Sequence, residues 1–209
     1  MRDEHCHIIW GVDDGSPNWE TTCAMVDAAR SCGFTEVTCT PHMRWEDFDH
    51  AVVRERFDRL AEYAPDITWT LGYEVYYKRL LSMGLEHAPE FTIGDTSTIL
   101  LEFNSGADVP HDWERTFYTL QGTYGLDIVL AHPERYRSVV KDFDLAYRMH
   151  EVGVKMQVSA GDLLGGPFDR GARTARRLVR EGLADAIVTD AHRPSHYDEY
   201  RRAIRKVRA

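Results

Sequence analysis

The sequence predicts an α/β protein whose parallel strands close, or nearly close, into a barrel. Short apolar segments alternate with longer amphipathic ones along the whole chain, which is the pattern of strands alternating with helices in a parallel sheet. In addition, the unusual polar residues fall at or just after the ends of the apolar segments. A parallel barrel brings such positions together on one face.

Seven short segments are expected to form strands, since several are rich in Val, Ile, Leu and Thr. They are residues 4–9, 36–40, 67–74, 98–103, 127–131, 155–159 and 186–189. Amphipathic segments between them are expected to form helices at residues 19–31, 46–63, 112–123, 142–152, 169–182 and 196–207. Gly33 follows the first of these helices, as glycine often does at a helix end.

The polar residues distinguish a closed barrel from an open sheet. They lie on or after six of the expected strands and comprise His5, His7, His42, Glu74, Glu102, His132, Asp190 and His192. Strands of an open sheet lie roughly 4.8 Å apart, so an open sheet would spread these side chains over more than about 30 Å. A barrel brings all the strand ends to one face, and the sequence therefore favours a barrel.

Composition limits the functions that the chain can have. Its 209 residues suffice for one well-buried domain, and a hydrophobic fraction of 43% is ordinary for a globular protein. The formal net charge of −9 argues against nucleic-acid binding, which favours a basic surface. No apolar run is long enough for membrane insertion, and the charged N-terminus lacks the apolar stretch of a signal peptide. The cytoplasm is therefore the expected location.

The cysteines do not indicate a disulfide framework or a cysteine nucleophile. Cys6, Cys23, Cys32 and Cys39 form no CxxC pair, so a zinc knuckle is not indicated. No cysteine begins the Cys-x5-Arg loop of cysteine-dependent phosphatases, because the residues at the sixth following position are Val12, Ala29, Thr38 and Trp45. We expect reduced thiols that are mostly packed.

His5 and His7 are candidate metal ligands. Alternate residues of a strand point to the same face, so these two imidazoles can hold one metal ion. Glu74 and Glu102 are carboxylates within apolar segments, where burial without a partner costs free energy and a metal ion would satisfy them. Mixed imidazole and carboxylate ligands suit Mn, Fe or Zn. The alternatives are a chance histidine pair and a Glu102 that binds an arginine inside the barrel.

The other candidates also have simpler interpretations. His42 could be a loop histidine, and Asp190 could cap a helix. Asp13-Asp14-Gly15 follows the first strand in a turn from which a carboxylate could reach the metals, although Asp-Gly is also a common turn pair. The coincidence of these residues at strand ends favours a metal site. The remaining histidines are expected at the surface, namely His50, His87, His111, His150 and His196.

Arginines near the candidate ligands indicate a phosphate substrate. Arg135 lies three residues after His132, and arginine binds phosphate through two parallel hydrogen bonds. A surface salt bridge is the alternative for this residue. Arg193 is a second candidate, and Arg201 is a weaker third. The basic segment 201–208 is expected to be a helix with one packed stripe rather than a nucleic-acid patch.

These motifs resemble those of the polymerase-and-histidinol-phosphatase (PHP) superfamily, and within it the bacterial manganese-dependent protein-tyrosine phosphatases of the CpsB/CapC/YwqE type. The matching stretches are His5-Cys6-His7-Ile8, Gly11-Val12-Asp13-Asp14-Gly15, Thr40-Pro41-His42, Gly72-Tyr73-Glu74, Leu101-Glu102-Phe103, Leu130-Ala131-His132-Pro133-Glu134-Arg135-Tyr136 and Thr189-Asp190-Ala191-His192. They run in order over nearly the whole chain. The resemblance implies a distorted seven-stranded (β/α) TIM-like barrel of the PHP type, with residues 1–209 as a single phosphatase domain.

The resemblance also implies three divalent metals at the carboxyl end of the barrel, with Mn favoured and Fe or Zn as alternatives. The implied ligands are His5, His7, Glu74 and Asp190 for the first metal, the bridging Glu74 with Glu102 and His132 for the second, and Asp14, His42 and His192 for the third. Glu102 is informative, because many other PHP phosphoesterases have histidine there while the tyrosine-phosphatase branch has glutamate.

The implied reaction is hydrolysis of protein phosphotyrosine by a metal-bound hydroxide. Arg135 would bind the phosphate, and Arg193 or Arg201 would be the second phosphate-binding arginine. The implied partner is a tyrosine-phosphorylated bacterial kinase that controls capsule or exopolysaccharide synthesis, and a homo-oligomer is compatible with the family. Segments 104–108 and 159–163 depart from the family pattern. A PHP phosphoesterase acting on a sugar phosphate, histidinol phosphate or nucleotide is therefore the alternative, and a non-catalytic binding module is a weaker one.

Overall fold

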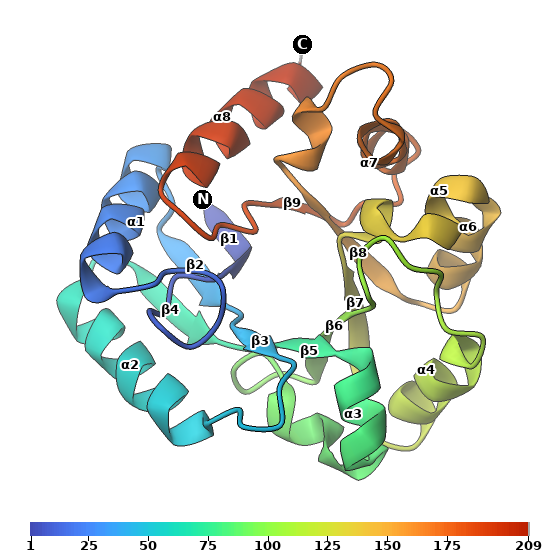
Figure 1. Cartoon of the computed structure of the whole chain (residues 1–209), viewed down its shortest axis with the longest axis horizontal. Helices are drawn as coiled ribbons and strands as arrows, with labels where there is room; N and C mark the ends of the chain where they lie inside the picture. Colours follow the sequence, from blue (N-terminus) through green and yellow to red (C-terminus); the bar gives the residue numbers. More distant parts are fainter. Residues whose placement is uncertain (209) are drawn as a thin grey trace.

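The computed structural model describes residues 1–208. Its strands form a ring surrounded by helices, and Figure 1 looks down into this ring. The strands are β1 (Arg2–Cys6), β2 (Glu36–Cys39), β3 (His42–Met43), β4 (Thr68–Leu71), β5 (Glu74–Tyr76), β6 (Thr98–Glu102), β7 (Asp127–Ala131), β8 (Lys155–Ser159) and β9 (Ala186–Val188). All of their pairings are parallel, which confirms the predicted α/β class.

The ring consists of two hydrogen-bonded sheets, with strand orders β1-β2-β4 and β3-β5-β6-β7-β8-β9. β3 follows β2 after Thr40-Pro41, and β5 follows β4 after Gly72-Tyr73, so each pair is one interrupted strand. Gly72 N donates to Cys39 O at 2.8 Å and Glu74 N donates to Pro41 O at 3.1 Å, which carries the hydrogen bonding across both gaps. Counted in this way the ring has the seven strands that the sequence predicts.

β1 and β9 complete the ring. Cys6 and Ala191 form a parallel bridge, Asp190 N donates to His5 O at 3.0 Å, and His7 N donates to Ala191 O at 2.8 Å. The first strand ends at Cys6, earlier than the predicted end at residue 9. The chain turns after His7, whose carbonyl accepts a hydrogen bond from Ser16 N at 3.0 Å, and this turn prevents further pairing.

Helices cover the outside of the ring. They are α1 (Trp19–Cys32), α2 (His50–Tyr63), α3 (Tyr77–Met83), α4 (Trp113–Gly122), α5 (Arg137–Lys141), α6 (Asp144–Glu151), α7 (Arg170–Arg180) and α8 (Ser195–Arg208), with the 3-10 helices η1 (Leu85–Phe91), η2 (Pro133–Arg135) and η3 (Asp162–Leu164). All six predicted helices are present. α3, η1 and α5 were not predicted, because they are short and Pro89 interrupts the helical pattern within η1.

Capping residues fix the ends of the two helices nearest the first strand. The Asn18 side chain accepts a hydrogen bond from Thr21 N at the start of α1, and Gly33 ends the helix with a φ of 84°. The predicted start of α2 at residue 46 is wrong. The helix begins at His50, because the Asp49 carboxylate accepts from Ala51 N and Val52 N and so satisfies the first free amides.

Few apolar side chains fill the inside of the ring. Leu100, Val129 and Ala131 form a small buried cluster of their own, packed against Ile93. Leu100 shares a face of β6 with Glu102, because alternate strand residues point the same way. The main apolar core is a separate, much larger cluster. The carboxyl end of the ring is therefore left to polar side chains.

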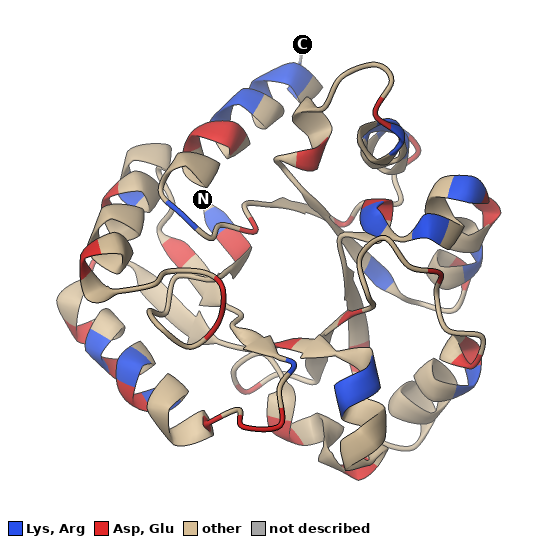
Figure 2. Cartoon of the chain, viewed as in Figure 1, with Lys and Arg blue, Asp and Glu red and all other residues tan. Residues whose placement is uncertain are grey.

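Charged residues lie mainly on the outer elements. In Figure 2, Lys and Arg mark α7 and the end of α8, whereas the loop that leads into α2 is coloured by Asp and Glu. Among residues 1–208, no helix is both long and apolar enough to cross a membrane. The four cysteines are free, as the sequence predicts.

Candidate metal centre

Imidazoles and carboxylates gather at the carboxyl end of the ring, at the positions that the sequence singles out. Three groups have ligand atoms that all lie within 4.8 Å of one another: His5, His7 and Asp190; His42, Glu74 and Glu102; and His7, Asp14, His42 and His192. His132 joins them through Nε2, which lies 2.7 Å from Glu74 Oε1. All nine predicted ligands thus lie in one connected cluster.

Glu74 lies at the centre of the cluster. Its Oε2 is 3.2 Å from His5 Nε2, 3.2 Å from His7 Nε2 and 3.0 Å from His42 Nδ1. Glu74 is fully buried, yet Oε2 has no hydrogen-bond partner among residues 1–208. Burial raises the pKa of this carboxyl, but the nearby charges of His5, His42 and His132 hold the pKa well below its ordinary value. A buried, ionised oxygen that faces several imidazoles is suited to bridging metal ions.

The alternation of the first strand places His5 and His7 together. Both are buried, and their Nε2 atoms are 3.1 Å apart, while Cys6 between them packs in the main core. Asp190 Oδ1 lies 3.6 Å from His5 Nε2 and 3.5 Å from His7 Nε2. Two imidazoles and two carboxylates, those of Glu74 and Asp190, therefore converge on one point from β1, β5 and the residues after β9.

Asp13 holds His7 and His42 in position, a role that was not predicted from the sequence. Its Oδ2 is 2.8 Å from His7 Nδ1 and accepts from His42 N at 3.0 Å, while Oδ1 accepts from Gly15 N at 3.0 Å. Burial lowers the pKa of His7, but the charge and hydrogen bond of Asp13 raise it well above its usual value. A Cβ on Gly15 would lie 2.2 Å from His7 O, so this tight turn requires glycine.

The third group is the most open part of the cluster. Asp14 Oδ1 lies 3.3 Å from His42 Nε2 and 3.6 Å from His192 Nε2, and Asp14 is exposed. The rings of His7 and His192 stack with centroids 4.0 Å apart. Burial lowers the pKa of His42, but the charge of Glu74, together with hydrogen bonds to Asp14 and Glu102, raises the pKa to about 11. Such a pKa reflects an excess of negative charge, which divalent cations would neutralise.

Glu102 has an arginine partner, which is the alternative that the sequence left open. Arg44 Nε donates to Glu102 Oε1 at 3.1 Å, and His42 Nδ1 lies 3.2 Å from the same oxygen. Arg44 follows His42 by two residues at the end of β3, so the strand period could have indicated its direction. The arginine is half-buried.

Backbone strain marks two of the candidate ligands. His132 and Asp190 are the non-glycine residues of the described chain with positive φ, at 34° and 48°. Such conformations persist where surrounding structure enforces them, and they concentrate at functional sites. His132 directly follows β7, and Asp190 lies two residues after the end of β9. The strain therefore coincides with the points where the chain aims a side chain into the cluster.

Arg135 lies beside the cluster, as expected for a phosphate-binding residue. Its Nη2 is 2.8 Å from Asp190 Oδ2, and its Nε donates to Asp162 Oδ2 at 2.7 Å. Ser159 Oγ also donates to Asp190 Oδ2, at 2.9 Å. Arg135 faces a cavity of about 400 Å³ whose lining includes Asp190 and His192. Asp162 and Ser159 lie in segment 159–163, which departs from the family pattern, but their bonds to Arg135 and Asp190 were not predicted.

The two candidates for a second arginine lie in different surroundings. Arg193 is exposed next to His192 and donates to Ser195 Oγ at 3.1 Å. Arg201 is bound to Asp198 and donates to Ser31 O of α1 at 3.5 Å. The surface assignment of His196 is wrong. This residue is half-buried, and its Nδ1 accepts from His192 N at 3.2 Å, because the turn into α8 folds back over the cluster.

A parallel barrel with imidazoles and carboxylates gathered at one end defines the class of metal-dependent barrel hydrolases. Comparison with known proteins narrows this class. Residues 1–206 match the CpsB/CapC family of capsular polysaccharide synthesis. The chain is 32% identical over 198 residues to the tyrosine-protein phosphatase YwqE of Bacillus subtilis, a match that covers 92% of this chain and 77% of YwqE. The chain therefore belongs to the CpsB/CapC family.

Two further comparisons agree with this assignment. The chain is 25% identical over 206 residues to the tyrosine-protein phosphatase CpsB of Streptococcus pneumoniae, covering 92% of this chain and 83% of that protein. Crystal structures of YwqE from Bacillus subtilis and CpsB from Streptococcus pneumoniae, described as metal-dependent tyrosine phosphatases, include a chain with a TM-score of 0.86 and 30% identity. That match covers 99% of this chain and 87% of the other, and it confirms both the resemblance and the barrel fold.

Proposed function

We infer that this chain is a metal-dependent protein-tyrosine phosphatase, with residues 1–209 as a single phosphatase domain. The observation that carries the metal dependence is Glu74 Oε2, which is buried, has no hydrogen bond among the described residues and faces three imidazoles. The phosphotyrosine specificity is supported by membership of the CpsB/CapC family, whose relatives YwqE and CpsB are tyrosine-protein phosphatases.

We propose three divalent metals per chain. The proposed ligands are His5, His7, Glu74 and Asp190 for the first, Glu74, Glu102 and His132 for the second, and Asp14, His42 and His192 for the third. His42 contacts both Glu102 through Nδ1 and Asp14 through Nε2, which supports a role at the boundary of the last two sets. The mixed nitrogen and oxygen donors suit Mn, with Fe and Zn as alternatives.

When bound, divalent metals lower the pKa of water, so they supply a hydroxide nucleophile near neutral pH and polarise the phosphoryl oxygens. The residues of the chain have the remaining tasks. Arg135 offers the phosphate a fixed guanidinium, because Asp162 holds its Nε. Arg193, at the rim beside His192, is the proposed second phosphate-binding arginine. Asp13 holds His7 with Nε2 directed at the cluster.

The proposed partner is a tyrosine-phosphorylated bacterial kinase that controls capsule or exopolysaccharide synthesis. Support comes from the family description, capsular polysaccharide synthesis. The cytoplasm is the proposed location, because the four free cysteines are typical of a reducing compartment. A homo-oligomer is compatible with this proposal, and oligomeric state is measured directly by light scattering of the purified protein.

Metal removal tests the proposed function. Protein stripped with a chelator should hydrolyse no phosphotyrosine peptide, and added Mn²⁺, Fe²⁺ or Zn²⁺ should restore activity in proportion to the metal bound. Loaded protein should prefer the peptide over histidinol phosphate, a sugar phosphate and a nucleotide. Thiol alkylation is the matched control and should leave the activity unchanged. Full activity of the metal-free protein would overturn the mechanism, and a preference for a small ester would overturn the substrate class.

A further inference from the structure

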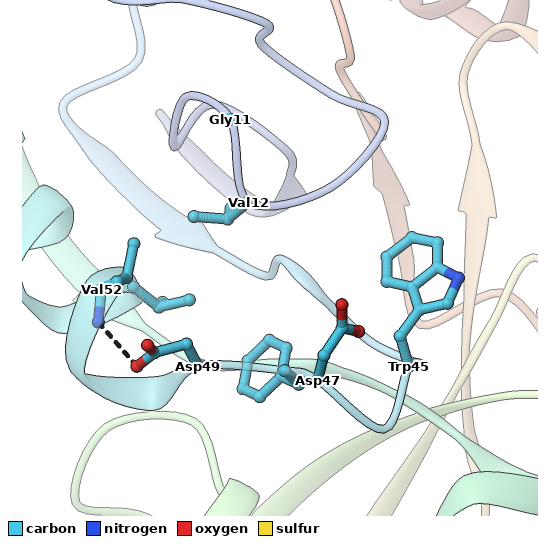
Figure 3. Close-up of a pocket in the computed structure, with 8 residues that line it drawn as sticks. Gly11, Val12, Trp45, Asp47, Asp49 and Val52 are labelled. Atoms are coloured by element: carbon cyan, nitrogen blue, oxygen red, sulfur yellow. Dashed lines mark hydrogen bonds between the residues drawn. The ribbon is translucent and has the colours of Figure 1, made fainter.

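A second cavity lies beside the metal centre and is not used by the proposed chemistry. It has a volume of about 430 Å³ and lies between the loop that contains Gly11 and Val12 and the segment that leads into α2 (Figure 3). The lining from that second segment is Trp45, Asp47, Phe48, Asp49, Val52 and Val53. The volume is within the range of pockets that bind a ligand group.

Residues that line the cavity lie next to the metal cluster, both along the chain and in space. Val12 directly precedes Asp13 and Asp14, which orient and extend the cluster. On the other side, the ring of Trp45 lies 6.3 Å from that of His42, edge to face. A peptide whose phosphate is at the cluster would therefore bring a neighbouring side chain to this cavity.

The chemistry of the lining selects one kind of side chain. Val12, Phe48 and Val52 supply apolar walls, while Trp45 and Asp47 line the cavity and are exposed. Lysine and arginine combine a long apolar stem with a cationic end, which a carboxylate attracts. Arg44 already lies 5.9 Å from the centre of the Trp45 ring, so the carboxylate is the main attraction for a substrate cation. An aromatic or aliphatic side chain would use the walls but leave the carboxylate unpaired.

Asp47 is the carboxylate that is available for such a cation. It is exposed, and among residues 1–208 it forms neither an ion pair nor a hydrogen bond to another side chain. Asp49 differs, because its Oδ1 already accepts from Ala51 N at 2.9 Å and Val52 N at 3.1 Å. The acidic character of this loop is visible in Figure 2.

The overall charge favours the same occupant. The chain carries a net charge of −9, so a substrate that is anionic outside its phosphate would be repelled. We propose that the cavity receives the side chain of a lysine or arginine that lies near the phosphotyrosine in the substrate. This proposal rests on the phosphatase function inferred above, and it adds a sequence preference to it.

Matched phosphopeptides test the preference. Peptides carry lysine, alanine, leucine or glutamate at each position that flanks phosphotyrosine, and kcat/KM is measured for the metal-loaded protein. At one position, lysine should exceed glutamate by about fivefold, the size expected when one exposed ion pair is replaced by one contact between like charges. Equal rates at every position, or a preference for leucine, would overturn the proposal while leaving the phosphatase function intact.

Three variants locate the source of the preference. Asp47→Asn should remove the discrimination between lysine and glutamate, and Asp47→Lys should reverse it, a gain that an unfolded protein cannot show. Asp58→Asn is the matched control, because Asp58 is an exposed acid of α2 outside the cavity lining. Asp58→Asn should keep the wild-type preference for lysine over glutamate. If Asp58→Asn loses this preference as fully as Asp47→Asn does, the preference comes from the overall charge of the protein and the cavity proposal is rejected. No hydrolysis of any of the phosphotyrosine peptides by the metal-loaded wild type would reject the phosphatase function itself, and the cavity proposal with it.

Discussion

Asp3 and Glu74 are both buried carboxylates of the barrel, but their surroundings differ. Asp3, on β1, accepts hydrogen bonds from Thr189 N at 3.1 Å and from Thr189 Oγ1 at 2.6 Å. Glu74 faces imidazoles, and its Oε2 has no hydrogen bond among the described residues. Burial therefore does not mark a functional carboxylate by itself. The informative feature is whether protein donors already satisfy the oxygen atoms.

The pKa values of the two carboxyls are shifted in opposite directions. Burial raises the pKa of Asp3 to about 6, and the hydrogen bonds from Thr189 offset only part of that effect. Burial also raises the pKa of Glu74, but the surrounding histidines lower it well below the ordinary value. Asp3 is thus a structural group whose charge is costly, whereas Glu74 is kept ionised and ready to bind cations.

The comparison predicts its largest effect for Glu74→Gln. The amide keeps the shape but loses the charge with which Glu74 would hold metal ions. Even outer-shell partners of metal ligands cost 10–100-fold, so kcat/KM on a phosphotyrosine peptide should fall by more than about 100-fold. Metal analysis of the purified protein should show fewer bound ions. Retention of metal and activity would break the distinction between the two carboxylates.

Asp3→Ala is the counterpart of that variant. It leaves the buried Thr189 N–H without an acceptor, so the free energy of unfolding should fall by about 1–3 kcal/mol. The metal-loaded protein should retain its kcat/KM, because Asp3 lies outside the ligand set. Chemical denaturation and peptide hydrolysis measure the two quantities. A loss of activity that exceeds the loss of folded protein would assign Asp3 to the site.

Arg135→Gln tests a cation instead of a carboxylate. Arg135 pairs with Asp190, which is a candidate metal ligand. The variant removes the guanidinium that is proposed to bind the phosphate oxygens, so kcat/KM should fall by about 100-fold. Bound metal should remain at the wild-type level, which separates this effect from that of Glu74→Gln. Arg137→Gln is the control, since Arg137 pairs with Asp108 at the surface. If both variants lose activity equally, Arg135 has no special role in binding phosphate.

Asp13 is an intermediate case, because it is satisfied by protein donors yet touches a candidate ligand. In Asp13→Asn, the amide can present N–H to His7 Nδ1, which favours the tautomer with a proton on Nε2 and blocks that nitrogen from metal. The metal affinity should fall by about tenfold, measured by competition with a chromogenic chelator. Excess metal should restore kcat. An unchanged affinity would show that the orientation of His7 has another source.

The barrel and the candidate ligands follow from local sequence signals. Short apolar segments locate the strands, and a parallel barrel fixes where the strand ends meet, so Glu74 and His132 could be placed near each other without coordinates. The bonds of Asp13 to His42 and of Asp162 to Arg135 could not be predicted in the same way. Each joins segments that are distant along the chain, and the direction of a side chain in a loop is set by turns that have no periodic pattern.

Side-chain directions also decide between Arg193 and Arg201 as the second phosphate-binding arginine. The variant that tests this choice has the smallest expected effect. Both are cations after the last candidate ligand, but Arg201 is already bound to Asp198 and α1, whereas Arg193 lies exposed beside His192. Arg193→Gln should lower kcat/KM on phosphotyrosine by about threefold, the scale of one exposed ion pair. Arg201→Gln should leave it unchanged and slightly reduce stability. The opposite result would mean that α8 shifts on substrate binding to free Arg201, and steady-state kinetics of the two variants side by side decides between these outcomes.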